Sequence, residues 1–222
     1  MHIPPVFRET DPAFLRAFLQ DNGFATLVSC DRGTPVATHL LLVARDSGGS
    51  ELRLRGHMSR ENPQWRSFDQ KDEVLAIFNG PHAYVSAGWY SVHSAPTWNY
   101  ISVHAYGRPR LIEDRGEVFT LLERLVDSQE VKFAVEARYR IESLPVEVRE
   151  SMMNGVAAFE IAVTRVEAAA KLSQNRSARD YQAIIDKLSA SQSPNSVEIA
   201  KEMERRKAQN ASRPIAGQVP DG

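Results

Sequence analysis

Residues 99–106, NYISVHAY, alternate two kinds of side chain along one predicted strand. Ile101, Val103 and Ala105 are aliphatic, so the face that they share is predicted to contact a hydrophobic core. The side chains between them are aromatic or polar: Tyr100, Ser102, His104 and Tyr106. This second face is too aromatic for an ordinary solvent-exposed surface and predicts a subunit interface or a site for a planar ligand. Both predictions, an interface and a ligand site, hold if the ligand lies between subunits.

Other apolar runs of strand length lie on both sides of this stretch. They are FATLVSC (24–30), VATHLLLVA (36–44), ELRLRGH (51–57), EVLAIFN (73–79) and HAYVSA (82–87). Residues that favour turns punctuate them: Asp31-Arg32-Gly33, Ser47-Gly48-Gly49, Asn79-Gly80-Pro81 and Gly107. Six strands with short turns favour an antiparallel β-barrel. The run 156–166, VAAFEIAVTRV, predicts a last strand.

Helical patterns flank the predicted strands, which makes the fold class α+β. Helices are expected over residues 11–21, 59–69, 116–126 and 145–154, and again on both sides of Ser193-Pro194. No repeat with a period of tens of residues is present. We expect a barrel domain over residues 1–170, a C-terminal helical segment over 171–211 and a disordered tail over 212–222.

Composition excludes several classes of protein. The 222 residues carry 27 lysines and arginines against 28 aspartates and glutamates, so no net charge attracts nucleic acid or a membrane. With one cysteine, Cys30, no secretory leader and no membrane-spanning apolar run, we expect a cytoplasmic protein. Cys30 ends an apolar run and is interpreted as a packed residue without a chemical role.

The histidines do not form a metal-binding motif. All six lie between His2 and His104, but none has the short spacing to another ligand that zinc sites use. No G-x-S-x-G elbow accompanies a catalytic triad. We therefore predict no catalytic residue and no metal site. Haem bound through one axial histidine stays open, because a single imidazole ligand needs no motif.

The segment LRLRGHMSRENPQW (52–65) is the strongest local candidate for a ligand site. Its predicted strand ends at Arg55-Gly56-His57, and the predicted helix starts at Ser59-Arg60. A helix N-terminus with a hydroxyl and a guanidinium group is suited to binding an anion, and phosphate is the commonest organic anion at such sites. Helix caps beside an arginine are also common in proteins without ligands, so the pattern alone leaves both interpretations open.

Several longer segments together resemble the PaiB family of FMN-binding negative transcriptional regulators. They are FRETDPAFLRAFLQDNGFATLVS, PVATHLLL, GHMSRENPQW, GPHAYVSAGWY, PTWNYISVHAYG and KLSQNR, in this order over residues 1 to about 190. That family is similar to the split barrels of the pyridoxamine-phosphate-oxidase type. The resemblance implies a homodimer that holds FMN in clefts between its subunits, with DNA as an expected partner.

The same resemblance assigns positions around the flavin. Ser59 and Arg60 fall where split barrels grip the FMN phosphate, directly after Arg55 and His57. The other positions lie at the flavin ring or in the C-terminal stretch that closes over it: Thr38, His39, Leu40, Ser102, Lys171 and Ser173. The oxidases carry further basic residues where this chain has Thr38, Val43 and Glu61. Losing these charge-assisted contacts, each worth about 1.5–3 kcal/mol, predicts weak FMN binding or a pocket that holds another ligand or none.

Four functions follow from these patterns. The first is a dimeric regulator that senses a ligand, binds flavin and does not turn it over. The second is a flavin-dependent oxidoreductase, in which FMN performs the redox chemistry. The third is a haem-handling split barrel, and the fourth is a dimer with a purely structural role. Direct DNA binding rests on the family alone, since the one basic cluster, Arg205-Arg206-Lys207, is typical of a solvated helix face.

Overall fold

A computed structural model of the chain describes residues 1–46, 51–68, 72–133 and 138–211. The predicted turn Ser47-Gly48-Gly49, the end of the predicted helix 59–69 and the predicted tail 212–222 lie outside the described residues.

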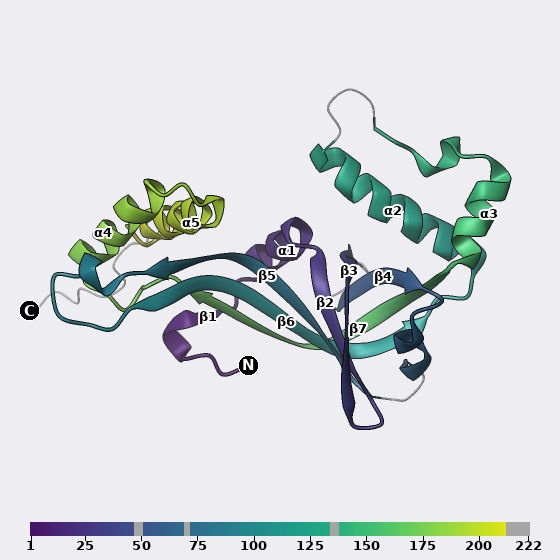
Figure 1. The fold of residues 1–222 in the computed structure, drawn as a ribbon, viewed down its shortest axis with the longest axis horizontal. Coiled ribbons are helices and arrows are strands. Elements are labelled where there is room, and N and C mark those ends of the chain that lie inside the picture. Colours follow the sequence, from purple (N-terminus) through teal and green to yellow (C-terminus); the bar gives the residue numbers. More distant parts are fainter. Residues whose placement is uncertain (47–50, 69–71, 134–137, 212–222) are drawn as a thin grey trace, which may run out of the picture. The chain divides into compact units, whose positions relative to one another are not determined.

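Six long strands form a sheet that closes on itself (Figure 1). The strand order is β1-β7-β4-β3-β2-β5-β6, and β6 also pairs with β7. The strands are β1 (Arg8–Glu9), β2 (Phe24–Asp31), β3 (Thr34–Asp46), β4 (Leu52–Ser59), β5 (Val74–Val85), β6 (Thr97–Leu111) and β7 (Val156–Lys171). The pairings from β5 through β2, β3 and β4 to β7 are antiparallel. The predicted α+β class with an antiparallel barrel is confirmed.

The barrel interior is filled by one face of each strand. On β6 the predicted alternation is confirmed, because Ile101, Val103 and Ala105 are buried while His104 and Tyr106 are only half-buried. The other strands contribute large side chains that solvent does not reach: Leu27, Leu42, Leu54, Phe78, Phe159 and Ile161. Burying such side chains is the main source of stability in a fold of this size.

Two predicted turns are wrong because the chain continues as strand through both. Asn79-Gly80-Pro81 lies inside β5, which joins the predicted runs 73–79 and 82–87 into one strand. Gly107 lies inside β6, where a Cβ atom would come within 2.4 Å of the Ala162 carbonyl oxygen on β7. The glycine is required there by the close approach of a neighbouring strand rather than by a turn.

The described chain forms two compact units. Unit 1 contains Met1, 10–79 and 102–168, and unit 2 contains 2–9, 80–101 and the residues from 169 onward. In unit 1, α1 (Pro12–Asp21) begins at Asp11, whose carboxylate accepts a hydrogen bond from the Ala13 N–H at 3.0 Å.

None of the helices in the described part of the chain is long and apolar enough to span a membrane.

Two further helices of unit 1 cover part of the sheet. They are α2 (Arg115–Phe133) and α3 (Val146–Asn154), with the short 3-10 helix η4 (Ile141–Ser143) between them. The apolar side of α2 packs with Leu41 and Val43 of β3 and with Ala158 of β7. The α2 residues in this cluster are Val118, Leu121, Leu122 and Leu125.

Unit 2 contains the two C-terminal helices, α4 (Ala178–Ser189) and α5 (Pro194–Ala211). Their facing residues include Ile184, Ile185 and Leu188 on α4 and Ile199 and Met203 on α5, and all five are buried. The Tyr181 hydroxyl donates a hydrogen bond to the Met203 carbonyl at 3.1 Å. Unit 2 also contains two 3-10 turns, η1 (Pro5–Phe7) and η3 (Ala87–Trp89), together with β1 and parts of β5, β6 and β7.

Candidate functional site

The predicted helix at residues 59–69 is wrong. Strand β4 runs through Ser59, and only a five-residue 3-10 helix, η2 (Pro63–Ser67), follows it. Its cap is Asn62, whose side-chain oxygen accepts a hydrogen bond from the Gln64 N–H at 3.0 Å. Asn62-Pro63 combines a good cap with a proline in the first turn, and this signal outweighs the one at Ser59.

The backbone N–H groups of this junction already have acceptors. The Arg60 N–H donates to the Gly155 carbonyl at 2.9 Å, and the Asn62 N–H donates to the Ser59 carbonyl at 3.0 Å. The Glu61 N–H donates to the Ser59 hydroxyl at 3.2 Å. A helix N-terminus that cradles a phosphate is therefore not present at residues 59–64. Side chains must hold any anion that binds here.

A buried glutamine fixes the junction against the sheet. The Gln64 side-chain amide donates to the Leu27 carbonyl and to the Ser29 hydroxyl, both at 3.1 Å. The Asn62 amide donates to the Thr38 hydroxyl at 2.8 Å, so the loop that carries Arg60 is joined to β3. The sequence analysis did not identify Gln64, because its partners lie in strands far away along the chain.

Arg60 is exposed and available to a ligand. Its guanidinium carbon lies 5.9 Å from the centre of the Trp65 ring, and the Trp65 N–H donates to the Arg60 carbonyl at 3.0 Å. Over residues 1–46, 51–68, 72–133 and 138–211, no carboxylate forms an ion pair with Arg60. The hydroxyls of Ser59 and Thr38 can still donate, since each accepts one hydrogen bond through its oxygen.

Arg55, by contrast, is committed to carboxylates within the protein. Only 5% exposed, it donates from Nε to Glu160 at 2.6 Å and lies 3.4 Å from a Glu117 oxygen. Glu160 is 1% exposed and also accepts hydrogen bonds from Arg53 at 2.7 Å and Arg110 at 3.0 Å. Burial alone would raise the pKa of Glu160, but these arginines outweigh it and lower that pKa to about 2.

Burial favours the neutral form of two histidines on β4 and β6. The ring of His57 on β4 is partly buried, and burial lowers its pKa below the usual value. Burial is also the main cause that lowers the pKa of His104 on β6. In both rings Nδ1 is buried, and no described residue forms a hydrogen bond with it. A neutral imidazole with a free ring nitrogen can accept from a donor or ligate a cofactor.

The remaining predicted residues of unit 1 lie on β3 and β6. His39 is exposed beside β2, with its Nδ1 3.0 Å from the Thr26 hydroxyl and its ring stacked on Phe24 at 6.2 Å. Leu40 points into the interior, so only its backbone can meet a ligand. Ser102 is buried, and its hydroxyl lies 3.2 Å from the Phe78 carbonyl.

The predicted residues Lys171 and Ser173 belong to unit 2. The Lys171 ammonium donates to the Thr97 hydroxyl at 2.5 Å. Ser173 is buried in a left-handed backbone conformation with φ of 61°, and its hydroxyl donates to the Asn99 side chain at 2.9 Å. In the same unit Arg176 stacks on Tyr90 at 4.1 Å, beside a pocket of about 680 Å³ lined by residues 87, 88 and 90–94.

Known proteins share both the sequence and the fold. The model of the family "Putative FMN-binding domain" matches residues 1–165. The chain is 37% identical over 204 residues to the protease synthase and sporulation protein PAI 2 of Bacillus subtilis, covering 92% of this chain and 97% of that protein.

Two solved structures share the fold at low sequence identity. The flavocytochrome Anf3 of Azotobacter vinelandii matches with a TM-score of 0.58 and 15% identity, over 82% of this chain and 78% of that one. The FAD and heme binding protein of Mycobacterium smegmatis matches with a TM-score of 0.54 and 18% identity, over 79% and 78%. The resemblance to PaiB is confirmed, and the chain belongs to the family of putative FMN-binding domains.

Proposed function

We propose that the protein is a flavin-binding regulator that holds FMN without a catalytic apparatus of its own. The observation that carries this proposal is the exposed guanidinium of Arg60, which forms no ion pair among the described residues and lies on a loop that is hydrogen-bonded to the hydroxyls of Ser59 and Thr38. The split-barrel resemblance assigns this position to the FMN phosphate, and family membership supports a flavin cofactor. FMN, when bound, supplies one- and two-electron redox chemistry. The relative PAI 2, a protease synthase and sporulation protein, supports a regulatory role in the cell.

Within this proposal Arg60 and Arg55 have different roles. Arg60 contacts the phosphate, because its guanidinium is exposed and has no carboxylate partner in the described chain. Arg55 stabilises β4 through Glu160 instead. His57 lies between them on β4, and burial lowers its pKa. Since backbone N–H groups do not contribute, FMN affinity depends on one charged side chain and two hydroxyls.

Replacing Arg60 with alanine should weaken FMN binding about 10- to 150-fold, the equivalent of one charge-assisted hydrogen bond of about 1.5–3 kcal/mol. Quenching of flavin fluorescence on titration with protein measures the dissociation constant. Arg205→Ala is the matched control, because Arg205 already pairs with Glu202 on α5 and should leave the affinity unchanged. Equal affinities for Arg60→Ala and wild type would remove Arg60 from the phosphate site.

An absorbance spectrum of the complex separates regulator from enzyme. A regulator should keep the oxidised flavin spectrum after NADH or NADPH is added, whereas an oxidoreductase should bleach it. The haem alternative gains support from the two neighbouring structures, whose names include a flavocytochrome and a heme binding protein. An intense haem band on adding haemin, lost in His57→Ala or His104→Ala, would favour that function over flavin binding.

We also propose that two copies associate through the outer face of β2 and β3. Phe24 is 71% exposed there and stacks on His39, and Thr26 of β2 lies opposite Ile77 of the neighbouring strand β5. Covering a phenylalanine is worth about 1.5–3 kcal/mol. Phe24→Ser should therefore raise the dimer dissociation constant at least ~10-fold in sedimentation velocity. Phe133→Ser on α2 is the exposed control, and dissociation by it alone would contradict this choice of face.

Contacts within unit 2 argue against DNA binding by the basic cluster of α5. Arg205 and Arg206 both pair with Glu202, and Arg206 pairs with Glu9 as well. Lys207 donates to the Gln182 side chain of α4 at 2.5 Å. Phosphate contacts require cations that are free to neutralise the phosphates and so displace the counterions condensed on the DNA. These contacts therefore favour a packing role for the cluster, and regulation through a ligand or a protein partner.

A further inference from the structure

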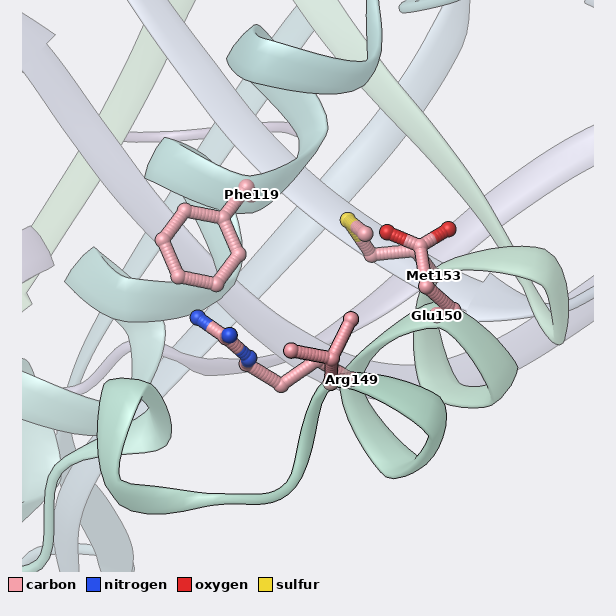
Figure 2. A pocket seen from close by; sticks show the side chains of 5 residues that line it. Phe119, Arg149, Glu150 and Met153 are labelled. Atoms are coloured by element: carbon pink, nitrogen blue, oxygen red, sulfur yellow. The ribbon is translucent and has the colours of Figure 1, made fainter.

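A pocket of unit 1 lies between α2 and α3, in residues that the proposed flavin site does not use. Its volume is about 200 Å³, and it is open to solvent. The lining side chains are Phe119 from α2 and Val146, Arg149, Glu150 and Met153 from α3 (Figure 2). The walls are mainly apolar, with one cation and one anion among them.

Arg149 has an unmet capacity for hydrogen bonds. Its guanidinium extends from α3 toward the ring of Phe119, 5.8 Å from the ring centre (Figure 2). Its Nε is buried and has no hydrogen-bond partner among the described residues. No carboxylate in the described ranges forms an ion pair with it. A buried donor without an acceptor costs about 1–3 kcal/mol, so an anion that supplied the acceptor would gain that free energy on binding.

The carboxylate of Glu150 is not that acceptor. It forms an ion pair with Arg115 at the start of α2, and Arg115 also donates to the Asn154 side chain at 3.0 Å. These contacts leave Arg149 as the one charged residue of the pocket lining without an ion pair among the described residues, although Glu142 lies close enough to interact with it electrostatically. The nearby carboxylate still opposes a ligand with two negative charges, because like charges at short range repel.

We propose that this pocket binds a small organic monoanion, a carboxylate attached to an apolar or aromatic body. The two carboxylate oxygens match the planar fork of the Arg149 guanidinium. The body of the ligand would lie against Phe119, Val146 and Met153. A cavity of about 150 Å³ accommodates benzene, so the volume here suits one ring together with its carboxylate. Such a site gives a ligand-sensing protein a second input that is separate from the flavin.

Benzoate is the test ligand, and the methyl resonance of Met153 is the reporter. The full-length protein, labelled at its methionine methyl groups, is titrated with benzoate and followed by NMR, with Met153→Leu identifying the signal. We expect a saturable shift of the Met153 methyl with a dissociation constant below about 10 mM, the value for a nine-atom ligand of ordinary efficiency. The methyl of Met203, buried in unit 2, is the internal control and should not move.

Two comparisons make the result specific to Arg149. Benzyl alcohol, a neutral molecule of similar shape, should bind at least ~10-fold more weakly than benzoate because it lacks the charge. Arg149→Gln should weaken benzoate at least ~10-fold, whereas Arg124→Gln, an exposed arginine of α2, should not. No saturable shift by about 50 mM, equal binding of both compounds, or unchanged affinity in folded Arg149→Gln would overturn the proposal. The first two of these outcomes are measured on the wild-type protein, so they do not depend on whether a variant folds.

Discussion

Replacing Glu160 with glutamine should lower the free energy of unfolding by about 3 kcal/mol at pH 7. Glutamine keeps the shape of the side chain but removes the charge that faces Arg53, Arg55 and Arg110. Arg55 is buried, and its remaining carboxylate contact, to Glu117, is 3.4 Å long. Urea denaturation at equilibrium measures the loss. The control is Glu198→Gln, whose carboxylate is 55% exposed and should contribute about 1 kcal/mol or less.

The pH dependence of this difference is a sharper check. The pKa of Glu160 is lowered from 4.5 to about 2 in the folded protein, so the unfolded chain binds this proton more tightly. The stabilisation is therefore complete above about pH 4.5 and is lost as the pH falls toward 2. Wild type and Glu160→Gln should converge over that range, because a protonated glutamate resembles glutamine. A difference that stays constant down to pH 3 would contradict the ion-pair explanation.

Gly107→Ala should be the most damaging substitution of a glycine on the described strands, with a loss of about 3 kcal/mol in unfolding free energy. The new Cβ would lie 2.4 Å from the Ala162 carbonyl oxygen and 2.7 Å from a methyl carbon of Ile161. A backbone atom of a paired strand cannot move away without breaking its ladder. Thermal and urea unfolding measure the effect.

Gly88→Ala is the matched control for this experiment. Its Cβ would meet only the Ser86 hydroxyl, at 3.6 Å, so we expect a change within about 0.5 kcal/mol. If Gly107→Ala were as mild as Gly88→Ala, β6 and β7 could not approach each other as closely as the structure has them.

The fold class could be predicted because periodic burial is a local signal. The two faces of β6 follow from the alternation at Ile101, Val103 and Ala105, and α1 follows from its cap at Asp11. Turn residues misled the prediction where tertiary pairing outweighs local preference. Asn79-Gly80-Pro81 continues a strand. Gly107 is required by the close approach of β7, which is distant in the sequence and so could not be recognised from the residues around Gly107.

The candidate site was less predictable because its decisive contacts join distant segments. The sequence around Arg55 would be the same whether Arg55 binds a phosphate or a protein carboxylate. Only the pairing of β4 with β7 shows that Arg55 binds Glu160. A single glutamate inside the apolar run 156–163 was the available signal for that partner. No signal in the sequence indicated Gln64 or Arg149. The role of Gln64 depends on hydrogen-bond acceptors that lie on other strands, and the role of Arg149 depends on the lack of an acceptor for its Nε among the described residues.

The long sequence separation of Arg55 and Glu160 also limits when their buried ion pair can form during synthesis. The two residues are 105 positions apart in the chain. At a translation rate of about 5–20 residues per second, Arg55 leaves the ribosome roughly 5–20 s before its partner. During that interval β4 lacks β7 and exposes an unpaired edge with an uncompensated cation. That charge discourages the edge from pairing with other nascent chains until the barrel can close.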